Sequence, residues 1–116
     1  MNFEYTFKQL DEISIIDFKG DLIDKGQAAQ MLYEIDKHIE KKENRFILDL
    51  ENLKYMNSSG LNILINILTK SRKSGGDVAI VHVSPKVNEL LTITKLNSIF
   101  NMSISIESAS NTLRKK

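Results

Sequence analysis

The sequence predicts a single α/β domain in which a mixed β-sheet of about four to five strands is packed by about four helices. Short apolar segments alternate along the chain with segments whose apolar residues recur at helical spacing, which favours parallel strands. The first two apolar segments are separated by only a short polar link, which predicts an antiparallel hairpin. No proline- or glycine-rich linker divides residues 1–116, so we expect one domain over this range.

The N-terminal hairpin is predicted by the period of its apolar residues. Aromatic and polar residues alternate in the first segment, as in a half-buried strand, and the aromatic ones are Phe3, Tyr5 and Phe7. Residues 13–20 form the second apolar segment, and Leu10–Glu12 suits a tight connection between the two. We therefore expect these two strands to pair antiparallel.

A helix and a buried strand are predicted next. Asp24 is suited to cap the helix, although Gly26 weakens its first turn. The helix ends in the charged stretch of residues 40–44, and its predicted core residues are Ala28, Met31, Leu32, Ile35 and Ile39. Residues 46–50 are apolar except for Asp49, which predicts a short strand covered on both faces.

The second predicted helix begins at Ser58-Ser59 and ends at Gly75-Gly76. Its core stripe is formed by Leu61, Leu64, Ile65 and Leu68. Ile63 and Ile67 lie off this stripe, and we expect them to pack against a neighbouring helix. If they were exposed instead, they would form a patch for a partner.

The C-terminal half continues the alternation of strand and helix. Residues 78–81 predict a buried strand, and Ser84-Pro85 opens a third helix with core residues Val87, Leu90, Leu91 and Leu96. A last, weaker strand is predicted within residues 100–106, where Met102, Ile104 and Ile106 alternate. Residues 107–116 are expected to form a terminal helix or to fray.

The composition excludes several classes of function. The 116 residues carry a net charge of +1 and contain no cysteine, which rules out disulfides, thiol catalysis and thiolate metal sites. Lysine and arginine are spread along the chain without interleaved aromatic residues, so we expect no nucleic-acid partner. No apolar run is long enough to span a bilayer and the first residues lack a signal-peptide pattern, so we expect a cytoplasmic protein without a membrane partner.

Catalytic and metal sites find little support in the sequence. His38 and His82 have no carboxylate or second histidine at ligand spacing, so we expect ordinary surface or strand-end histidines and no metal site. Gly75-Gly76 follows a helix and precedes a strand, the reverse order of a phosphate-binding loop. Ser58 is not in a hydrolase elbow, because Met56 occupies the position of its first glycine. We therefore expect no enzymatic activity and no cofactor.

The two serines at the start of the second helix are the most informative residues. Their hydroxyls lie where unpaired backbone N–H groups and the helix dipole stabilise negative charge, so a phosphoryl group would be tolerated there. The same group would change the surface that a partner meets. A serine here can instead cap a backbone N–H group, and the spacing does not say whether Ser58 or Ser59 caps and which stays exposed.

Several stretches together resemble a known family. They are Phe46–Leu50 with Met56–Leu61, Gly75–Val78, Val83–Val87, and Leu90-Leu91, Leu96 and Ile99-Phe100 in the following leucine-rich segment. The chain resembles the STAS domain, and within it the bacterial anti-sigma factor antagonists, also called anti-anti-sigma factors. The match covers nearly the whole chain and is strongest from residue 46 to residue 100, which implies a single STAS domain over residues 1–116.

The resemblance implies a function in partner switching. The first serine of the family's motif is phosphorylated, which points to Ser58, with Ser59 as the fallback, whereas the family's preceding acidic residue is Asn57 here. The unphosphorylated protein would bind an anti-sigma factor that is also a serine kinase of the histidine-kinase-like ATPase fold, and so free a sigma factor. The kinase would end this binding by phosphorylating Ser58, and a metal-dependent serine phosphatase would restore it.

The expected partner surface combines the serine turn, the exposed side of its helix and the loop after the second strand, which resembles the family loop beside the phosphosite. Its predicted residues are Asp21, Asp24, Met56, Asn57, Ser58, Ser59, Gly60, Leu61, Asn62 and Asn66. We expect a monomer, with a weak dimer as the alternative. The alternative function is a non-switching STAS scaffold or a subunit module of a signalling or lipid/solute system, and the neutral Asn57 favours it.

Overall fold

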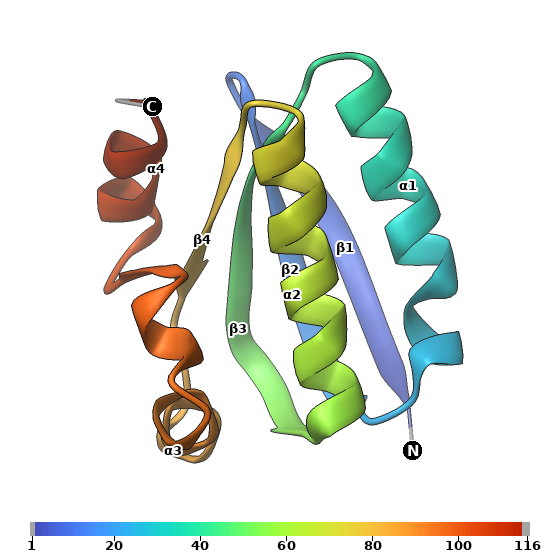
Figure 1. The fold of residues 1–116 in the computed structure, drawn as a ribbon, viewed down its shortest axis with the longest axis vertical. Coiled ribbons are helices and arrows are strands. Elements are labelled where there is room, and N and C mark those ends of the chain that lie inside the picture. The colour runs from blue at the N-terminus through green and yellow to red at the C-terminus, as the bar shows by residue number, and fades with distance from the viewer. Residues whose placement is uncertain (1, 115–116) are drawn as a thin grey trace.

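The sheet at the centre of the fold is mixed, and its strands lie side by side in chain order (Figure 1). The computed structural model describes residues 2–114. Within them β1 is antiparallel to β2, and the other neighbouring strands are parallel. The strands are β1 (Phe3–Leu10), β2 (Ile13–Leu22), β3 (Arg45–Met56), β4 (Asp77–Val81) and β5 (Asn101–Ser103). The predicted hairpin and the predicted parallel core are both confirmed.

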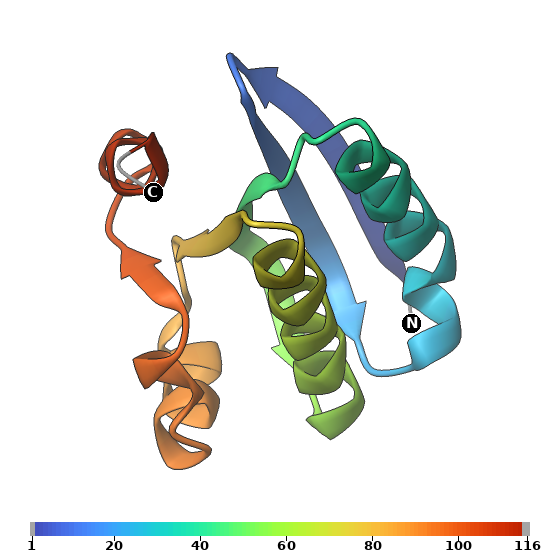
Figure 2. The same ribbon diagram turned by 45° about the horizontal axis from the view of Figure 1, so that its top comes forward.

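Helices lie on both faces of this sheet. The helices are α1 (Ala29–Glu40), α2 (Ser58–Lys73), α3 (Pro85–Ile93) and α4 (Ile106–Arg114), and short 3-10 turns cover Lys25–Ala28 and Leu96–Ser98. Figures 1 and 2 show α1 and α2 side by side across one face. Val87 and Leu91 of α3 join the core on that face. On the opposite face Ala109 and Leu113 of α4 pack against β2, β3 and β4.

The end of α2 and the start of α3 lie where the capping residues of the sequence predict them. Gly75 has φ +93°, a left-handed conformation that glycine adopts readily, and it lies just after the end of α2. The Val87 backbone N–H donates to Ser84 Oγ at 3.2 Å, so Ser84 caps α3, and Pro85 occupies the first helical position. Both boundaries depend on short-range chemistry alone, which explains why the sequence predicts them.

β3 is much longer than the strand predicted over residues 46–50. It continues to Met56 because β2 remains paired with it as far as the pair Leu22–Met56, through two shifts in register. β4 pairs with β3 only as far as Asp49. The second half of β3 therefore carries the chain past the end of β4 and delivers it directly to the start of α2.

Two helix predictions need correction. Asp24 precedes a 3-10 turn rather than α1, because Gln27 Oε1 accepts the N–H groups of Ile23 and Asp24 at 3.0 Å and tightens this segment. In α2, Ile65 is only half-buried, while Ile63 and Ile67 are buried as expected for residues that face a neighbouring helix. The apolar stripe is wider than predicted because α2 packs against both the sheet and α1.

The C-terminal part differs most from the prediction. Leu90 and Leu96 are half-buried rather than fully buried. The last strand has only three residues, Ile104 is 90% exposed, and Ile106 begins α4. The strand predicted within residues 100–106 is therefore confirmed, but the alternation does not continue it through Ile104 and Ile106, because the chain leaves the sheet after β5 to place α4 on the other face. The predicted terminal helix is confirmed over Ile106–Arg114, and residues 115–116 lie outside the described residues.

Candidate functional site

The candidate site is the turn that joins the end of β3 to the start of α2. β3 ends at Met56 and α2 begins at Ser58, so Asn57 is the single residue between them. In sheets with parallel strands, ligands and partners commonly bind beyond the carboxyl ends of the strands. The structure therefore places both serines at the N-terminus of a helix of 16 residues, just beyond the carboxyl end of β3, where binding sites are common.

Asn57 is the residue that holds this turn together. Its Oδ1 accepts the backbone N–H of Gly60 at 3.1 Å, which makes Asn57 the N-cap of α2. Its Nδ2 donates to the backbone oxygen of Ile23 at 3.1 Å, and so ties the loop after β2 to the start of the helix. The side chain that replaces the family's acidic residue thus makes two hydrogen bonds, one of which a carboxylate could not make.

Neither serine is needed as a cap. Among residues 2–114, the Ser58 and Ser59 side chains make no hydrogen bond, and Ser58 is exposed while Ser59 is half-buried. The alternative in which one of the two serines caps the helix does not hold, because the residue before them takes that role. The exposed Ser58 hydroxyl is therefore available for chemistry with a second protein.

Asn57→Ala tests the structural part of this arrangement. We expect it to lower the free energy of unfolding by about 1–3 kcal/mol, because it removes the helix cap and leaves the Ile23 oxygen without its amide donor. Urea unfolding followed by circular dichroism measures the change. Asn57→Asp is the matched control, since it keeps the cap on Gly60 and loses only the bond to the Ile23 oxygen. Its free energy of unfolding should lie between those of the wild type and Asn57→Ala. An unchanged stability of Asn57→Ala would show that neither bond contributes.

The charges around the turn favour an added anion. No acidic side chain lies in the first turn of α2, so its free backbone N–H groups and dipole are not neutralised locally by a carboxylate. The basic residues of α2 lie in its last turn. A phosphoryl group on Ser58 would therefore meet the positive end of a helix whose first turn carries no charged side chain.

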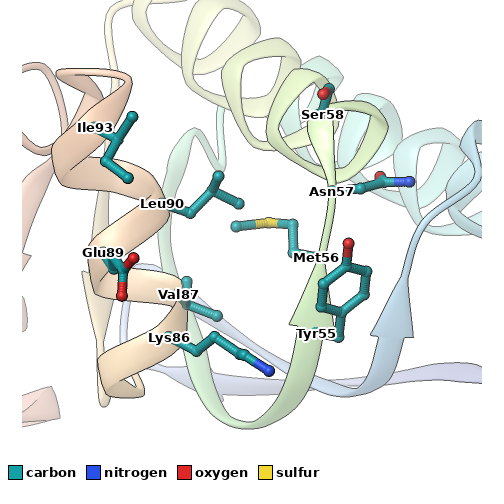
Figure 3. Close-up of a pocket in the computed structure, with 9 residues that line it drawn as sticks. All are labelled: Tyr55, Met56, Asn57, Ser58, Lys86, Val87, Glu89, Leu90 and Ile93. Atoms are coloured by element: carbon teal, nitrogen blue, oxygen red, sulfur yellow. The ribbon is translucent and has the colours of Figure 1, made fainter.

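An open groove of about 370 Å³ separates the serine turn from α3 (Figure 3). Its lining residues are Tyr55, Met56, Asn57, Ser58, Lys86, Val87, Glu89, Leu90 and Ile93. Tyr55 is 47% exposed and Ile93 is 70% exposed, so two large apolar side chains flank the groove. The sequence analysis missed the contribution of α3, because only the folded sheet brings α3 beside the end of β3.

The predicted partner residues fall into two groups. Met56, Gly60 and Leu61 are buried and support the turn from inside. The remaining predicted residues are exposed or half-buried, and these are Asp21, Asp24, Asn57, Ser58, Ser59, Asn62 and Asn66. A hollow of about 180 Å³ between Lys25, Ser59 and Asn62 joins the loop after β2 to the helix, so the two predicted parts of the surface are adjacent.

Both histidines lie beside carboxylates that their sequence spacing did not predict. His38 Nδ1 lies 2.9 Å from Glu43 Oε1, and His82 Nδ1 lies 2.9 Å from Asp49 Oδ1. The Asp49 partner is 33 positions away from His82 and reaches it through the pairing of β3 with β4. Asp17 on β2 lies next to Asp49. The pKa of Asp17 is raised above its usual range by burial, by a hydrogen bond with Asp49 and by the negative charge of Asp49.

The fold and this turn define a small α/β domain that presents an exposed serine at a helix N-terminus. Comparison with known proteins places it. The family model of the STAS domain matches residues 4–109. The chain therefore belongs to the STAS domain family. Within residues 2–114, none of the helices has the length and apolar character that crossing a bilayer requires.

Relatives and solved structures agree with this assignment. The chain is 29% identical over 104 residues to BtrV of Bordetella bronchiseptica, covering 90% of this chain and 89% of BtrV. It is 27% identical over 100 residues to the anti-sigma F factor antagonist of Paenibacillus polymyxa, covering 85% of each chain. The NMR structure of the Thermotoga maritima protein TM1081 superposes with a TM-score of 0.84 at 26% identity, covering 97% of this chain and 90% of that one.

Proposed function

We propose that this protein is an anti-sigma factor antagonist whose binding is switched off by phosphorylation of Ser58. One observation carries this proposal: the Ser58 hydroxyl at the N-terminus of α2 is exposed and does not serve as the helix cap. The relative from Paenibacillus polymyxa is named as an antagonist of an anti-sigma factor, which supports the class of partner. In this account the protein is the substrate and ligand of other proteins rather than a catalyst.

The partner we propose is an anti-sigma factor that is also a serine kinase of the histidine-kinase-like ATPase fold. The unphosphorylated protein binds it and frees a sigma factor. The kinase transfers the γ-phosphoryl group of ATP to Ser58 Oγ, releasing ADP and the hydroxyl proton, and a metal-dependent serine phosphatase returns the protein to its binding form. Ser59 is half-buried, which makes it the weaker acceptor of the two.

The physical effect of this modification differs between folding and binding. Phosphorylation adds a charge of about −1.5 to −2 at neutral pH. At the start of α2 the helix dipole stabilises this charge by about 0.3–1 kcal/mol, so the domain remains folded. At an interface the same group must be desolvated or meets a surface shaped for a neutral hydroxyl, which costs several kcal/mol. Binding is therefore affected far more than stability.

The proposed binding surface comprises the serine turn, the groove beside it and the loop after β2. Tyr55 and Ile93 supply exposed apolar area in the groove that Ser58 lines, and Lys25 and Asn62 supply polar groups in the hollow beside Ser59. Ser58 lies between these two regions, because it lines the groove while the neighbouring Ser59 lines the hollow beside Asn62. A phosphoryl group at this position would therefore meet the middle of the interface rather than its rim.

Ser58→Ala and Ser59→Ala distinguish the two acceptors. With the purified cognate anti-sigma factor and ATP, we expect the wild type and Ser59→Ala to incorporate phosphate and dissociate. Ser58→Ala should incorporate none and remain bound, as measured by intact-protein mass spectrometry and analytical size exclusion. If no variant incorporates phosphate while all remain bound, the protein is a scaffold that does not switch. If Ser58→Ala still incorporates phosphate, the phosphorylated residue is not Ser58.

A further inference from the structure

A group of polar side chains lies on the face of the sheet opposite α1 and α2. Asp49 and Glu51 are two positions apart on β3 and point to the same face. Leu48 and Leu50 alternate with them and belong to the main core, so the two carboxylates point away from that core. Asp49 precedes the end of β3 by roughly 20 Å along the strand, and this group is therefore separate from the serine turn.

The pairing of β3 with β4 brings a histidine to these carboxylates. Asp49 is the register partner of Val81, the last residue of β4, and His82 follows directly. His82 has φ +57°, a left-handed conformation that is uncommon for a residue other than glycine. The chain turns there, and the imidazole lies against β3 with its Nδ1 toward the two carboxylates.

The distances within the group are near those that a metal ion requires. His82 Nδ1 lies 2.9 Å from Asp49 Oδ1 and 3.9 Å from Glu51 Oε1. One donor atom from each of the three residues can be chosen so that all lie within 4.8 Å of one another. Ligands bonded to one tetrahedral ion at about 2.0–2.2 Å are separated by about 3.3 Å, so small side-chain rotations complete the geometry.

The nearly buried position of Asp49 gives a cation a reason to bind. The Asp49 side chain is 9% exposed, whereas that of Glu51 is 68% exposed. A carboxylate removed from water requires a compensating positive charge or hydrogen bonds. Asp49 accepts the backbone N–H of Glu51 at 3.1 Å, and beside it lie the imidazole of His82, which is neutral in the form that binds a metal, and the carboxyl group of Asp17, which adds no positive charge. A divalent ion held by the three side chains would supply the missing positive charge.

We propose that Asp49, Glu51 and His82 form a binding site for a divalent first-row transition-metal ion such as Zn²⁺. One imidazole nitrogen with two carboxylate oxygens suits such an ion better than Mg²⁺ or Ca²⁺, which prefer oxygen ligands alone. His82 also lines an open hollow of about 490 Å³ with Ser103 and Asn88, which leaves room for water or an external ligand to complete the coordination. The site does not depend on the proposed function of Ser58.

His38 provides an internal comparison. Its Nδ1 lies at the same distance of 2.9 Å from a carboxylate, that of Glu43. Among residues 2–114, the grouping of three metal-ligating side chains is found at His82 and not at His38. The two histidines therefore share an ordinary histidine–carboxylate contact and differ in the second carboxylate, so we expect His82, and not His38, to bind a metal ion.

Titration of the full chain with ZnCl₂ in a calorimeter tests this inference. We expect one Zn²⁺ ion to bind per chain, and His82→Ala and Glu51→Gln each to raise Kd at least about tenfold. His38→Ala is the matched control and should leave Kd unchanged. Glu51→Gln alters an exposed side chain and keeps its size, so it tests the site even if His82→Ala unfolds. Broadening of amide NMR signals by Mn²⁺ then locates the ion, with the strongest effect expected at residues 49–51 and 81–83.

Three results would overturn the proposal. The first is the absence of Zn²⁺ binding to the wild type, in which case His82 and Asp49 form only a hydrogen-bonded pair. The second is Zn²⁺ binding that persists unchanged in both His82→Ala and Glu51→Gln. The third is binding that is lost in His38→Ala, which would place the ion at the other histidine. None of these results bears on Ser58, so the proposed function would stand or fall separately.

Discussion

Ser58→Glu is expected to weaken binding of the anti-sigma factor by at least about 100-fold, which corresponds to about 2.7 kcal/mol. The carboxylate places a negative charge between the groove beside α3 and the hollow beside Asn62, where a partner must desolvate it. The melting temperature should move by less than about 4 °C, since the start of α2 favours a negative charge. Isothermal calorimetry and thermal unfolding measure the two effects on the same samples.

Ser58→Gln is the matched control for this substitution. Glutamine has nearly the size of glutamate without its charge, so it separates repulsion from steric hindrance. We expect Ser58→Gln to bind more tightly than Ser58→Glu. Equal losses in the two variants would mean that the interface excludes any larger side chain at this position. A large drop in the melting temperature of both variants would show that Ser58 is structural, contrary to its exposure.

Gly60→Val is expected to destabilise the domain by at least about 3 kcal/mol and to abolish partner binding with it. A Cβ atom at this position would lie 2.5 Å from the backbone oxygen of Leu22 and 2.5 Å from Met56 Cγ. The side chain of Met56 could move, but the backbone of β2 could not do so without breaking its pairing with β3. Valine adds two further carbons to this clash and would push the start of α2 off the sheet.

Gly26→Val is the matched control for Gly60→Val. Gly26 is exposed, and its added Cβ would meet only the flexible end of Asp24 at 3.1 Å. We expect this variant to lose less than about 1 kcal/mol. Urea unfolding of both variants gives the comparison. Similar stability of the two variants would contradict the tight packing of α2 against the end of β2.

Local patterns predict the parts of this fold that depend on neighbouring residues. The alternation of strands and helices, the capping role of Ser84 and the end of α2 near Gly75 follow from periodicity, a hydroxyl before a proline and a glycine pair. The burial of Ile63 and Ile67 also follows, because helical spacing places both toward a neighbouring helix. These features depend little on residues that are distant in the sequence.

The features that sequence reasoning missed depend on strand pairing. β3 extends to Met56 because β2 continues beside it, and His82 meets Asp49 because β4 ends at the register partner of that residue. Asn57 departs from the family pattern, and the structure shows what the amide does: its two hydrogen bonds reach Gly60 and Ile23. The second of these partners is 34 positions away, so no local pattern could indicate it.

The exposure of Ser58 follows from the same bonds. Because Asn57 caps α2, Ser58 lies one position inside the helix with its hydroxyl free. The sequence placed the candidate serines correctly at the helix start, and the folded turn makes Ser58 the more accessible one.

The central claim is that Ser58 is phosphorylated and that its phosphate responds to the state of the cell. Phosphopeptide mass spectrometry on the protein isolated from its own cells, during growth and under stress, tests this claim most directly. We predict phosphate on Ser58 whose occupancy changes with the condition, and little on Ser59. An unphosphorylated Ser58 under every condition, in protein that still co-purifies with a stable partner, would contradict the switch.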